Sequence, residues 1–518
     1  MLVQSLLFDR KASSHPAVVC ADRGVTASYA DLARNAEELA ARLARAGLRG
    51  GERAAILLPN SIEFAAAFFG SLTAGAVAVP MDIYLRKDDL LRILAVVKPA
   101  VLITNHNLFR KIKSDLGSVK ACLIEYGAGL TIDFPDRNAE GTAGEDARPK
   151  SEFPDASHPD RTDPAEDALM IMSSGTTGLP KAVRLSHRAV LNNIGMHLES
   201  LDLSGDIRGL QVLPLNFSYG LIASFLGILR TGGTAVLLPN PEPGPIWEAI
   251  GRYDINLFSG TPTLFQYIIE KSTHVFSAAP LRYLTIGGDR CKRYALDLIR
   301  SEMPSARVYI TYGLSEAGPR VSTLPHELIA ELPNSVGLPL KGVEVSILDA
   351  EGKSCSPCTP GEIVVRSPSL MNGYFGDADR TARVLQGGRC HTSDIGYVDG
   401  RGFLYYVGRK DRQFKFGGRN VNPSFIEQCI STHPLVREVH VAKIETDRDE
   451  MICARIKAGD CGEEEMLREL TILCRKHMPA YMVPAEFVFE DHDHYYYKGK
   501  IFNPRKEQLP SGPVCDRR

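Results

Sequence analysis

The sequence is poor in the features that would indicate a disulfide-rich, nucleic-acid-binding or membrane protein. Cysteine supplies 11 of the 518 residues, an odd number with irregular spacing. A disulfide scaffold is therefore not expected, whereas a reducing compartment is. Lysine and arginine number 60 against 62 aspartates and glutamates, which gives a formal net charge of −2. This balance argues against the strongly basic surface that nucleic acid or an anionic membrane would need.

Long hydrophobic runs are missing too. The longest, over residues 64–80, is interrupted by Gly70 and Gly75 and has the pattern of a helix followed by a strand. At the start of the chain the apolar stretch ends at Asp9 and Arg10, too early for a signal peptide. We therefore expect a cytoplasmic protein that neither spans nor binds a membrane.

Two short runs contain metal-binding residue types, but neither predicts a metal site. Cys355 and Cys358 have CxxC spacing, yet they lie among serine, proline and threonine without a second pair. Residues 491–494 alternate aspartate and histidine. That run is more typical of a solvated acidic turn.

What is present is an ordinary globular composition, with 44% apolar and 24% charged residues. Single cores stop growing near about 250–300 residues, so a chain of this length should form at least two domains. Buried-strand patterns alternate with helical ones, and Asn60 followed by Glu63 predicts the start of the helix at 60–69. The strand patterns lie at 53–58, 76–79, 101–104, 168–172 and 307–310, and the helical ones at 60–69 and 88–97. This alternation predicts an α/β fold with a largely parallel sheet.

The pattern of predicted helices and strands changes towards the carboxy terminus. After a loop-like stretch at 133–167 and short strand patterns from about 340, a compact α+β pattern follows residue 411. Its predicted elements are helices at 424–431 and 463–477 and strands at 436–444, 451–457 and 485–489. We therefore divide the chain into a large domain at 1–410 and a small one at 411–518.

The densest chemical pattern is Ser-Ser-Gly-Thr-Thr-Gly-Leu-Pro-Lys at residues 173–181, directly after a predicted strand. The glycines free the backbone to curl, so that hydroxyl and N–H groups converge on one concavity with a lysine at its end. Such an arrangement cradles phosphate oxygens. It is not a Walker A loop, because Pro180 and Ala182 stand where that motif needs glycine and a hydroxyl residue.

Several motifs in one order resemble those of the adenylate-forming superfamily, which holds acyl- and aryl-CoA synthetases, adenylation domains of nonribosomal peptide synthetases and firefly-type luciferases. Besides 173–181, the matching stretches are Thr311-Tyr-Gly-Leu-Ser-Glu316, Asn372-Gly-Tyr-Phe375, Thr392-Ser-Asp394, Gly408-Arg-Lys-Asp411, residues 415–423 and Gly499-Lys500-Ile501. Ser315 replaces the family's usual threonine and Ser393 its usual glycine. The resemblance spans roughly residues 15–510 and implies mixed sheets flanked by helices in a large domain, with a small α+β domain that rotates about a hinge.

The resemblance also implies roles that suit the chemistry. Activating a carboxylate with ATP requires cations and N–H donors that offset the repulsion between anions. Lys500 and Glu316 are the implied catalytic residues, with Glu316 and Thr176 holding Mg²⁺. Asp411 is the implied hinge, and Gly417 and Gly418 belong to the loop that serves the thiol acceptor. The implied ATP- and AMP-binding residues are Ser173, Ser174, Gly175, Thr176, Thr177, Gly178, Lys181, Gly288, Asp289, Thr311, Tyr312, Gly313, Ser315, Asp394 and Arg409.

The acid pocket is predicted from segments that resemble the walls of acyl- and aryl-CoA ligase pockets. Its expected residues are Asn216, Phe217, Ser218, Tyr219, Gly260, Gly287, Gly313 and Leu314. No acidic residue occurs between Leu210 and Asn240 to pair an α-amine, so an α-amino acid is disfavoured. No lysine or arginine falls in these segments before Arg290, so they do not obviously provide for a second carboxylate.

The predicted activity is the ATP- and Mg²⁺-dependent conversion of an aryl or acyl carboxylic acid to acyl-AMP, followed by transfer to a thiol. The thiol belongs to CoA or to the phosphopantetheine of a separate acyl carrier protein. Two alternatives remain open: transfer of the adenylate to an amine, which gives an amide, and a non-catalytic nucleotide-binding module. Neither the acid nor the oligomeric state follows from the sequence.

Overall fold

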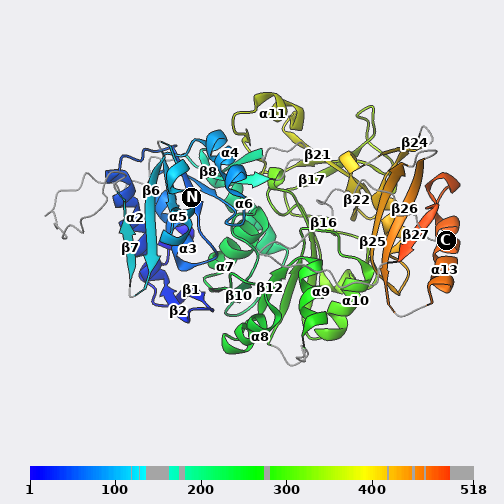
Figure 1. The fold of residues 1–518 in the computed structure, drawn as a ribbon, viewed down its shortest axis with the longest axis horizontal. Helices are drawn as coiled ribbons and strands as arrows, with labels where there is room; N and C mark the ends of the chain where they lie inside the picture. Colours follow the sequence, from blue (N-terminus) through cyan, green and yellow to red (C-terminus); the bar gives the residue numbers. More distant parts are fainter. Residues whose placement is uncertain are drawn as a thin grey trace.

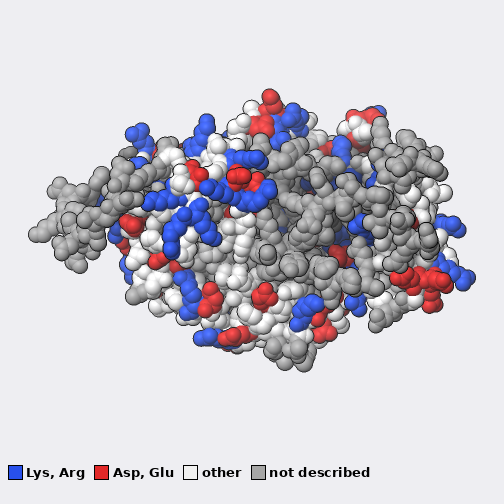
Figure 2. All heavy atoms as spheres, in the orientation of Figure 1, with Lys and Arg blue, Asp and Glu red and all other residues white. Residues whose placement is uncertain are grey.

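The computed structural model describes residues 1–117, 119–127, 129–135, 163–173, 181–272, 280–412, 414–416, 419–445, 450–459 and 462–489. The described chain forms an elongated molecule with its first sheets and helices at one end of the long axis and the last described elements at the other (Figure 1). On the described part of the face in Figure 2 both signs of charge are present, and neither Lys and Arg nor Asp and Glu cover it alone. No described helix combines the length and apolarity that crossing a bilayer requires.

An eight-stranded sheet carries the predicted early alternation. Its spatial order is β19 (Gly373–Tyr374), β9 (Lys181–Ser186), β8 (Asp167–Ser173), β4 (Val77–Pro80), β3 (Arg53–Leu57), β5 (Val101–Thr104), β6 (Lys120–Tyr126) and β7 (Leu130–Asp133). The strands from β8 to β6 run parallel, whereas β19, β9 and β7 join antiparallel at the edges. The sheet is therefore mixed, with the parallel part central.

A nine-stranded sheet follows the same plan. Its order is β16 (Leu338–Pro339), β15 (Ser322–Leu324), β14 (Arg307–Tyr312), β13 (Tyr283–Ile286), β12 (Leu257–Gly260), β10 (Arg208–Gln211), β11 (Thr234–Leu237), β1 (Pro16–Cys20) and β2 (Val25–Ser28). Strands β14 to β1 are parallel, and their carboxyl ends meet at one edge. In open parallel sheets that edge is where ligands bind.

Helices lie between and around these sheets. Helix α3 (Ile62–Thr73) contacts β3 and β4 of one sheet and β1 of the other, and all but its last residue are buried. Because α3 is buried between the two sheets, packing inside the protein accounts for the apolar run that begins at residue 64. The remaining helices of this part are α1 (Ser5–Phe8), α2 (Tyr29–Arg45), α4 (Lys87–Val97), α5 (His106–Ile112), α6 (His187–Glu199), α7 (Gly227–Thr231), α8 (Pro243–Arg252), α9 (Pro262–Lys271) and α10 (Arg293–Glu302), with a π-helix at Tyr219–Leu226.

The predicted start of α3 is wrong by one residue. Ser61 is the N-cap, because its hydroxyl accepts the Phe64 N–H at 3.1 Å. Asn60 instead donates to the Leu213 carbonyl at 3.0 Å and accepts from the Leu215 N–H, which ties the helix to a distant loop. The local pattern therefore located the helix, while a long-range contact decided the role of Asn60.

A five-stranded antiparallel sheet connects these layers to the carboxy-terminal elements. It contains β17 (Glu344–Leu348), β18 (Gly361–Arg366), β21 (Arg389–Val398), β20 (Leu385–Gln386) and β22 (Leu404–Arg409), and α11 (Ala378–Val384) precedes β20. Strand β22 contacts helix α12 (Pro423–Ile430), the first helix of the last segment. Gly408 in β22 has no room for a side chain, because a Cβ there would lie 2.6 Å from Ser424.

The last segment has a hydrophobic core of its own, which runs from Val421 to Met478. The hairpin β23 (Phe414–Phe416) and β24 (Arg419–Val421) precedes α12. Strands β25 (Val436–Glu445), β26 (Glu450–Ala458) and β27 (Glu486–Phe489) form one sheet, and α13 (Glu463–His477) packs on α12. These bounds match the predicted elements to within one or two residues, although the boundary at residue 411 stays a prediction.

Candidate active site

Three predicted nucleotide residues meet where the nine-stranded and five-stranded sheets adjoin. The Tyr312 hydroxyl, at the end of β14, donates to Asp394 Oδ2 of β21 at 2.7 Å. Arg409 of β22 is the cross-strand partner of Asp394, and its Nη1 lies 3.3 Å from Asp394 Oδ1. Asp394 is only 4% exposed, and burial together with its charge raises the pKa of Tyr312 well above its usual range. The tyrosine therefore stays a neutral donor to a buried carboxylate.

The backbone at Ser393, an irregular position inside β21, explains why glycine is usual there. Ser393 has a φ of 59°, in the left-handed region, where a side chain costs about 1–2 kcal/mol. Two bonds hold this conformation: Ser393 N–H donates to Glu362 Oε1, and Asp394 N–H donates to the Thr392 hydroxyl. The strain is compatible with the fold because these bonds fix the direction of the Asp394 side chain.

A second cluster joins the end of the glycine-rich segment to Glu316. Ser173 and Lys181 are cross-strand partners in the β8–β9 hairpin. The Lys181 Nζ lies 5.6 Å from the centroid of the Tyr374 ring, within the range of a cation–π contact. The Tyr374 hydroxyl donates to Glu316 Oε1 at 2.8 Å. Tyr374 thus connects the predicted phosphate cation with the predicted magnesium ligand.

Several predicted residues lie outside the described part of the chain. They are Ser174, Gly175, Thr176, Thr177, Gly178, Gly417, Gly418 and Lys500. Asp411 lies in the described turn Lys410–Arg412, but its side chain is not described. The roles expected of these residues stay predictions.

The half-buried Glu316 suits a magnesium ion that also takes phosphate oxygens. Mg²⁺ is commonly bound through one or two carboxylates together with substrate phosphates and water. Tyr374 occupies Oε1, and among the described residues no hydrogen bond is donated to Oε2. The described residues contain no group of three acidic, histidine or cysteine side chains placed to hold a metal, and this includes the neighbourhood of Cys355 and Cys358.

The predicted acid-pocket segment lies next to the same motif. The Ser218 hydroxyl is 2.8 Å from that of Ser315, and the Tyr219 hydroxyl donates to the Thr285 carbonyl at 2.8 Å and more weakly to that of Gly260. Tyr219 begins the π-helix Tyr219–Leu226, a wide turn that is often found at functional sites. Asn216 is half-buried, whereas Phe217 is 46% exposed.

The glycines of this region have packing reasons for lacking a side chain. A Cβ on Gly287 would lie 2.4 Å from the Thr311 hydroxyl, and one on Gly260 would lie 2.8 Å from Phe265. A Cβ on Gly313 would lie 2.2 Å from the Pro319 carbonyl, beside Leu314, so two stretches of backbone touch there. Gly288, with a φ of 82°, precedes Asp289, whose Oδ1 accepts the Arg290 N–H.

Two residues near the site were not among the predicted ones. Tyr374 could have been found, because it lies inside the Asn372–Phe375 match. Arg320 follows Glu316 by four residues, yet nothing in the local pattern indicates that it is buried. Its guanidinium carbon lies 3.9 Å from the centroid of the Tyr219 ring.

Comparison with known proteins identifies the family. The family model of AMP-binding enzymes matches residues 8–375, which is most of the chain. The chain belongs to this family.

Relatives agree with the assignment. The chain is 29% identical over 486 residues to feruloyl-CoA synthase of Amycolatopsis sp, covering 93% of this chain and 94% of the relative. O-succinylbenzoate coenzyme A synthetase of Bacillus subtilis, solved with ATP and magnesium, is 25% identical with a TM-score of 0.76 and coverage of 94% and 96%. The amide bond synthetase McbA of Marinactinospora thermotolerans is 26% identical with a TM-score of 0.78 and coverage of 94% and 95%.

These findings confirm the predicted fold class and the predicted superfamily. The chain is therefore an AMP-binding enzyme, and the two relatives named for coenzyme A are ligases that form thioesters. The residue roles, the acid and the identity of the acceptor go beyond the comparisons.

Proposed function

We propose that the enzyme activates an aryl or acyl carboxylic acid, not an α-amino acid, and transfers the acyl group to CoA. One observation carries the proposal: segments from four distant parts of the chain converge in two adjoining clusters. The first joins Tyr312, Asp394 and Arg409, and the second joins Lys181, Tyr374 and Glu316. One cluster suits a nucleoside and the other a metal-bound polyphosphate.

The first cluster would hold the nucleoside. Asp394 would accept from the ribose hydroxyls, and Arg409, whose Nη1 lies 3.3 Å from Asp394 Oδ1, would donate to the same sugar. The centroid of the Tyr312 ring lies 5.7 Å from that of Tyr406. The Tyr312 ring would offer an aromatic edge or face against which adenine could pack. The buried position of Asp394 strengthens its hydrogen bonds because little water competes for it.

The second cluster would hold the phosphates and Mg²⁺. Glu316 would supply the protein carboxylate for Mg²⁺, which when bound would neutralise charge on the phosphate oxygens. Tyr374 orients Glu316, and Lys181 stands where the phosphate segment ends. Lys500 would bridge the substrate carboxylate and the α-phosphate from the small domain.

The acid class follows from the charges around Phe217 and Tyr219. No carboxylate in the pocket segments pairs an ammonium, whose burial alone costs several kcal/mol. Phe217 is 46% exposed, so an aryl or alkyl group could bury apolar surface against it. Such burial contributes roughly 25 cal/mol of binding free energy per Å². The relative named for feruloyl-CoA supports an aryl acid.

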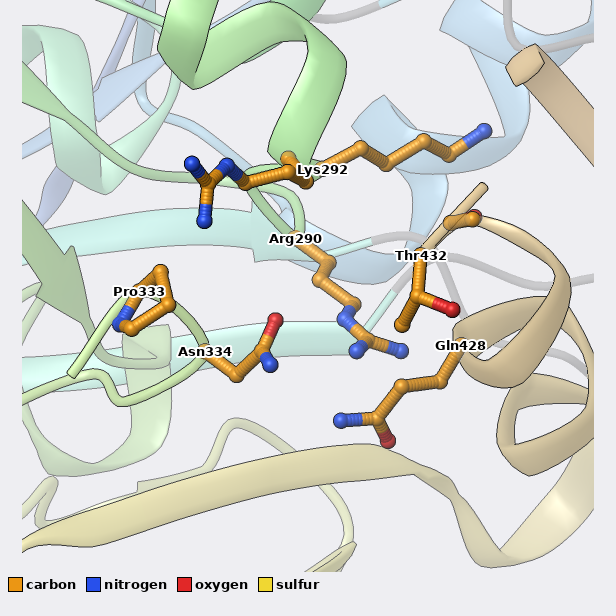
Figure 3. A pocket seen from close by; sticks show the side chains of 8 residues that line it. Arg290, Lys292, Pro333, Asn334, Gln428 and Thr432 are labelled. Atoms are coloured by element: carbon orange, nitrogen blue, oxygen red, sulfur yellow. The ribbon is translucent and has the colours of Figure 1, made fainter. Parts of the chain in front are cut away.

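CoA is the favoured acceptor because a cation-lined cavity of about 110 Å³ lies between the residues that follow Gly288 and the end of helix α12. Arg290, Lys292 and Arg293 contribute from one side and Gln428, Ser431 and Thr432 of α12 and its end from the other. Figure 3 shows the Arg290 guanidinium between Asn334 and the side chains of Gln428 and Thr432. Arg290 is separated from the predicted pocket residues Gly287 and Gly288 only by Asp289, so an anion here would lie near the acid. A phosphate of CoA has the matching charge.

Two anchors delimit the proposed hinge. Arg409 is held in β22 and by Asp394, whereas Arg412 pairs with Glu427 of α12 at 2.9 and 3.3 Å. The chain between these anchors consists of Lys410 and Asp411. This arrangement supports a small domain that reorients about residue 411 between the two half-reactions.

An amide product is the second candidate. The observation that favours it is the likeness to an amide bond synthetase over 94% of this chain. Both activities share the adenylate, so only the second step separates them.

The test is an ATP–pyrophosphate exchange screen over aryl, fatty and amino acids, followed by addition of CoA or amines to the positive reactions. We expect exchange with aryl or alkyl acids and an acyl-CoA product. Asp394→Ala should raise KM for ATP, whereas Asp297→Ala, which removes an exposed carboxylate paired with Arg293, should not. Exchange with amino acids alone would refute the acid class, and products from amines but not from CoA would refute the acceptor.

A further inference from the structure

Two cysteine side chains meet where helices α12 and α13 pack together, in the last segment of the chain (Figure 1). Cys429, in the last turn of α12, is partly buried, whereas Cys474 of α13 is fully buried in the core of this segment. The Cys474 thiol is hydrogen-bonded to that of Cys429, and Cys429 Sγ lies 3.9 Å from the Leu473 carbonyl. Both residues are thiols in the structure, and their sulfur atoms are in contact.

A second contact between the same two elements fixes this arrangement. Just beyond the end of α12, His433 Nε2 lies 2.8 Å from Glu469 Oε2 of α13. His433 is four residues after Cys429, and Glu469 is four residues before Leu473. Four residues are about one helical turn, so the two contacts follow each other along antiparallel elements. The packing of α12 on α13 therefore holds the two thiols opposite each other.

The two thiols differ in a way that suits stepwise oxidation. The hydrogen bond from Cys474 lowers the pKa of Cys429, while the same bond and burial raise the pKa of Cys474. The thiolate is the form that reacts with peroxides, and Cys429 is also the more accessible of the two. Cys429 would therefore react first, and Cys474 lies where a resolving thiol must lie.

Other described cysteines lack this combination. Cys355 and Cys358 have CxxC spacing, yet no hydrogen bond joins their thiols among the described residues, and burial raises the pKa of Cys355. Burial also raises the pKa of four further thiols, those of Cys20, Cys122, Cys291 and Cys390. A raised pKa leaves less thiolate, so these residues should react more slowly.

We propose that Cys429 and Cys474 form a reversible disulfide when the enzyme meets hydrogen peroxide. The Cys429 thiolate attacks one peroxide oxygen, the O–O bond breaks, and Cys429 becomes a sulfenic acid while the other oxygen leaves as hydroxide and is protonated to water. The Cys474 sulfur then attacks Cys429 Sγ, the S–O bond breaks, and the hydroxide leaves with the Cys474 proton as a second water. The two thiols together give up two electrons, which reduce the peroxide. This redox step needs neither the acid nor the acceptor, so it is independent of the proposed function.

The bond would join α12 to α13 and close the stretch of chain between them. In a reducing compartment it would form only while peroxide is present, as is usual for redox-sensing pairs. A disulfide restricts the unfolded chain, so the oxidised small domain should resist denaturant better than the reduced one. A dithiol would reverse the change by thiol–disulfide exchange.

The test treats the reduced full-length enzyme with hydrogen peroxide and maps its disulfides by mass spectrometry of digests prepared without reductant. We expect a linked peptide pair that contains Cys429 and Cys474, an intact mass lower by two hydrogen atoms, and recovery of both thiols with dithiothreitol. The oxidised enzyme should unfold at a higher denaturant concentration than the reduced enzyme. In Cys474→Ala, dimedone should label Cys429 as a trapped sulfenic acid, because the resolving thiol is gone.

Cys358→Ser is the matched control, because it removes an exposed thiol outside the pair. It should form the linked pair at the wild-type rate, whereas Cys429→Ser should lose the pair. Should Cys474→Ala fail to fold, Cys429→Ser still decides, since it changes only one atom of a partly exposed side chain.

Three results would overturn the inference. One is a disulfide from Cys429 or Cys474 to another cysteine in place of the expected pair. Another is peroxide treatment that oxidises Cys358 while Cys429 and Cys474 stay reduced. The third is a linked pair that forms only after the chain has been unfolded, which would show that the fold does not hold the two thiols in position to react.

Discussion

Removing the Tyr374 hydroxyl tests whether this residue orients the magnesium ligand. In Tyr374→Phe the ring that faces Lys181 remains, and only the 2.8 Å bond to Glu316 is lost. A hydrogen bond to a charged group contributes about 1.5–3 kcal/mol. If the bond acts in the transition state, kcat/KM for MgATP should fall about 10- to 100-fold, since about 1.4 kcal/mol corresponds to a factor of ten.

Exchange rates measured against magnesium concentration would show the effect, and the variant should need more magnesium for half-maximal rate. Tyr309→Phe is the matched control, because the Tyr309 hydroxyl is buried with no hydrogen-bond partner among the described residues. That control should exchange like the wild type. Equal rates and equal magnesium dependence in the two variants would refute the orienting role of Tyr374.

Three further predictions concern catalysis and stability. Lys500→Ala should nearly abolish acyl-AMP formation but spare thioester formation from preformed acyl-AMP, as half-reaction assays would show; equal losses would contradict two active arrangements. Burial lowers the pKa of His187 to about 4 against an ordinary 6.5, so only the unfolded chain takes up this proton between those values. Stability should therefore fall by about 3 kcal/mol as the pH drops from 7 to 4, and His187→Asn should flatten that slope in denaturant titrations. Ser393→Gly should relieve the left-handed strain and raise the free energy of unfolding by about 0.5–1 kcal/mol, after subtraction of the entropy that glycine loses on folding; an unchanged denaturation midpoint would contradict it.

The sequence pattern predicted helices and strands well where the buried residues recur with the period of a helix or form a continuous apolar strand. The helix at 88–97 and the strand at 101–104 were located to within one residue, and so was the small α+β pattern after residue 411. Each of these has a continuous apolar face or run that no distant contact needs to define. The start of α3 was misplaced because Asn60 is used by a loop more than 150 residues away.

Those site residues that lie within short continuous sequence motifs could be predicted. Asp394 and Arg409 follow from short matches, and β-strand register then brings them together. Arg320 was not predictable, because its environment depends on Gly313 letting two backbone stretches touch and on Tyr219 arriving from a π-helix. A sequence gives no indication that an arginine between proline and valine will be enclosed.

The short span between Arg409 and Arg412 has a kinetic consequence for the proposed alternation. With both neighbours anchored, a change of arrangement reduces to torsion about a few backbone bonds, since each residue has only two soft dihedrals. A long linker would let the small domain take many orientations. Its effective concentration at the active site would then be lower, because effective concentration falls with linker length. A two-residue pivot restricts the search to a narrow arc. The small domain should therefore move between its two positions along a restricted rotation, without a diffusive search for its target.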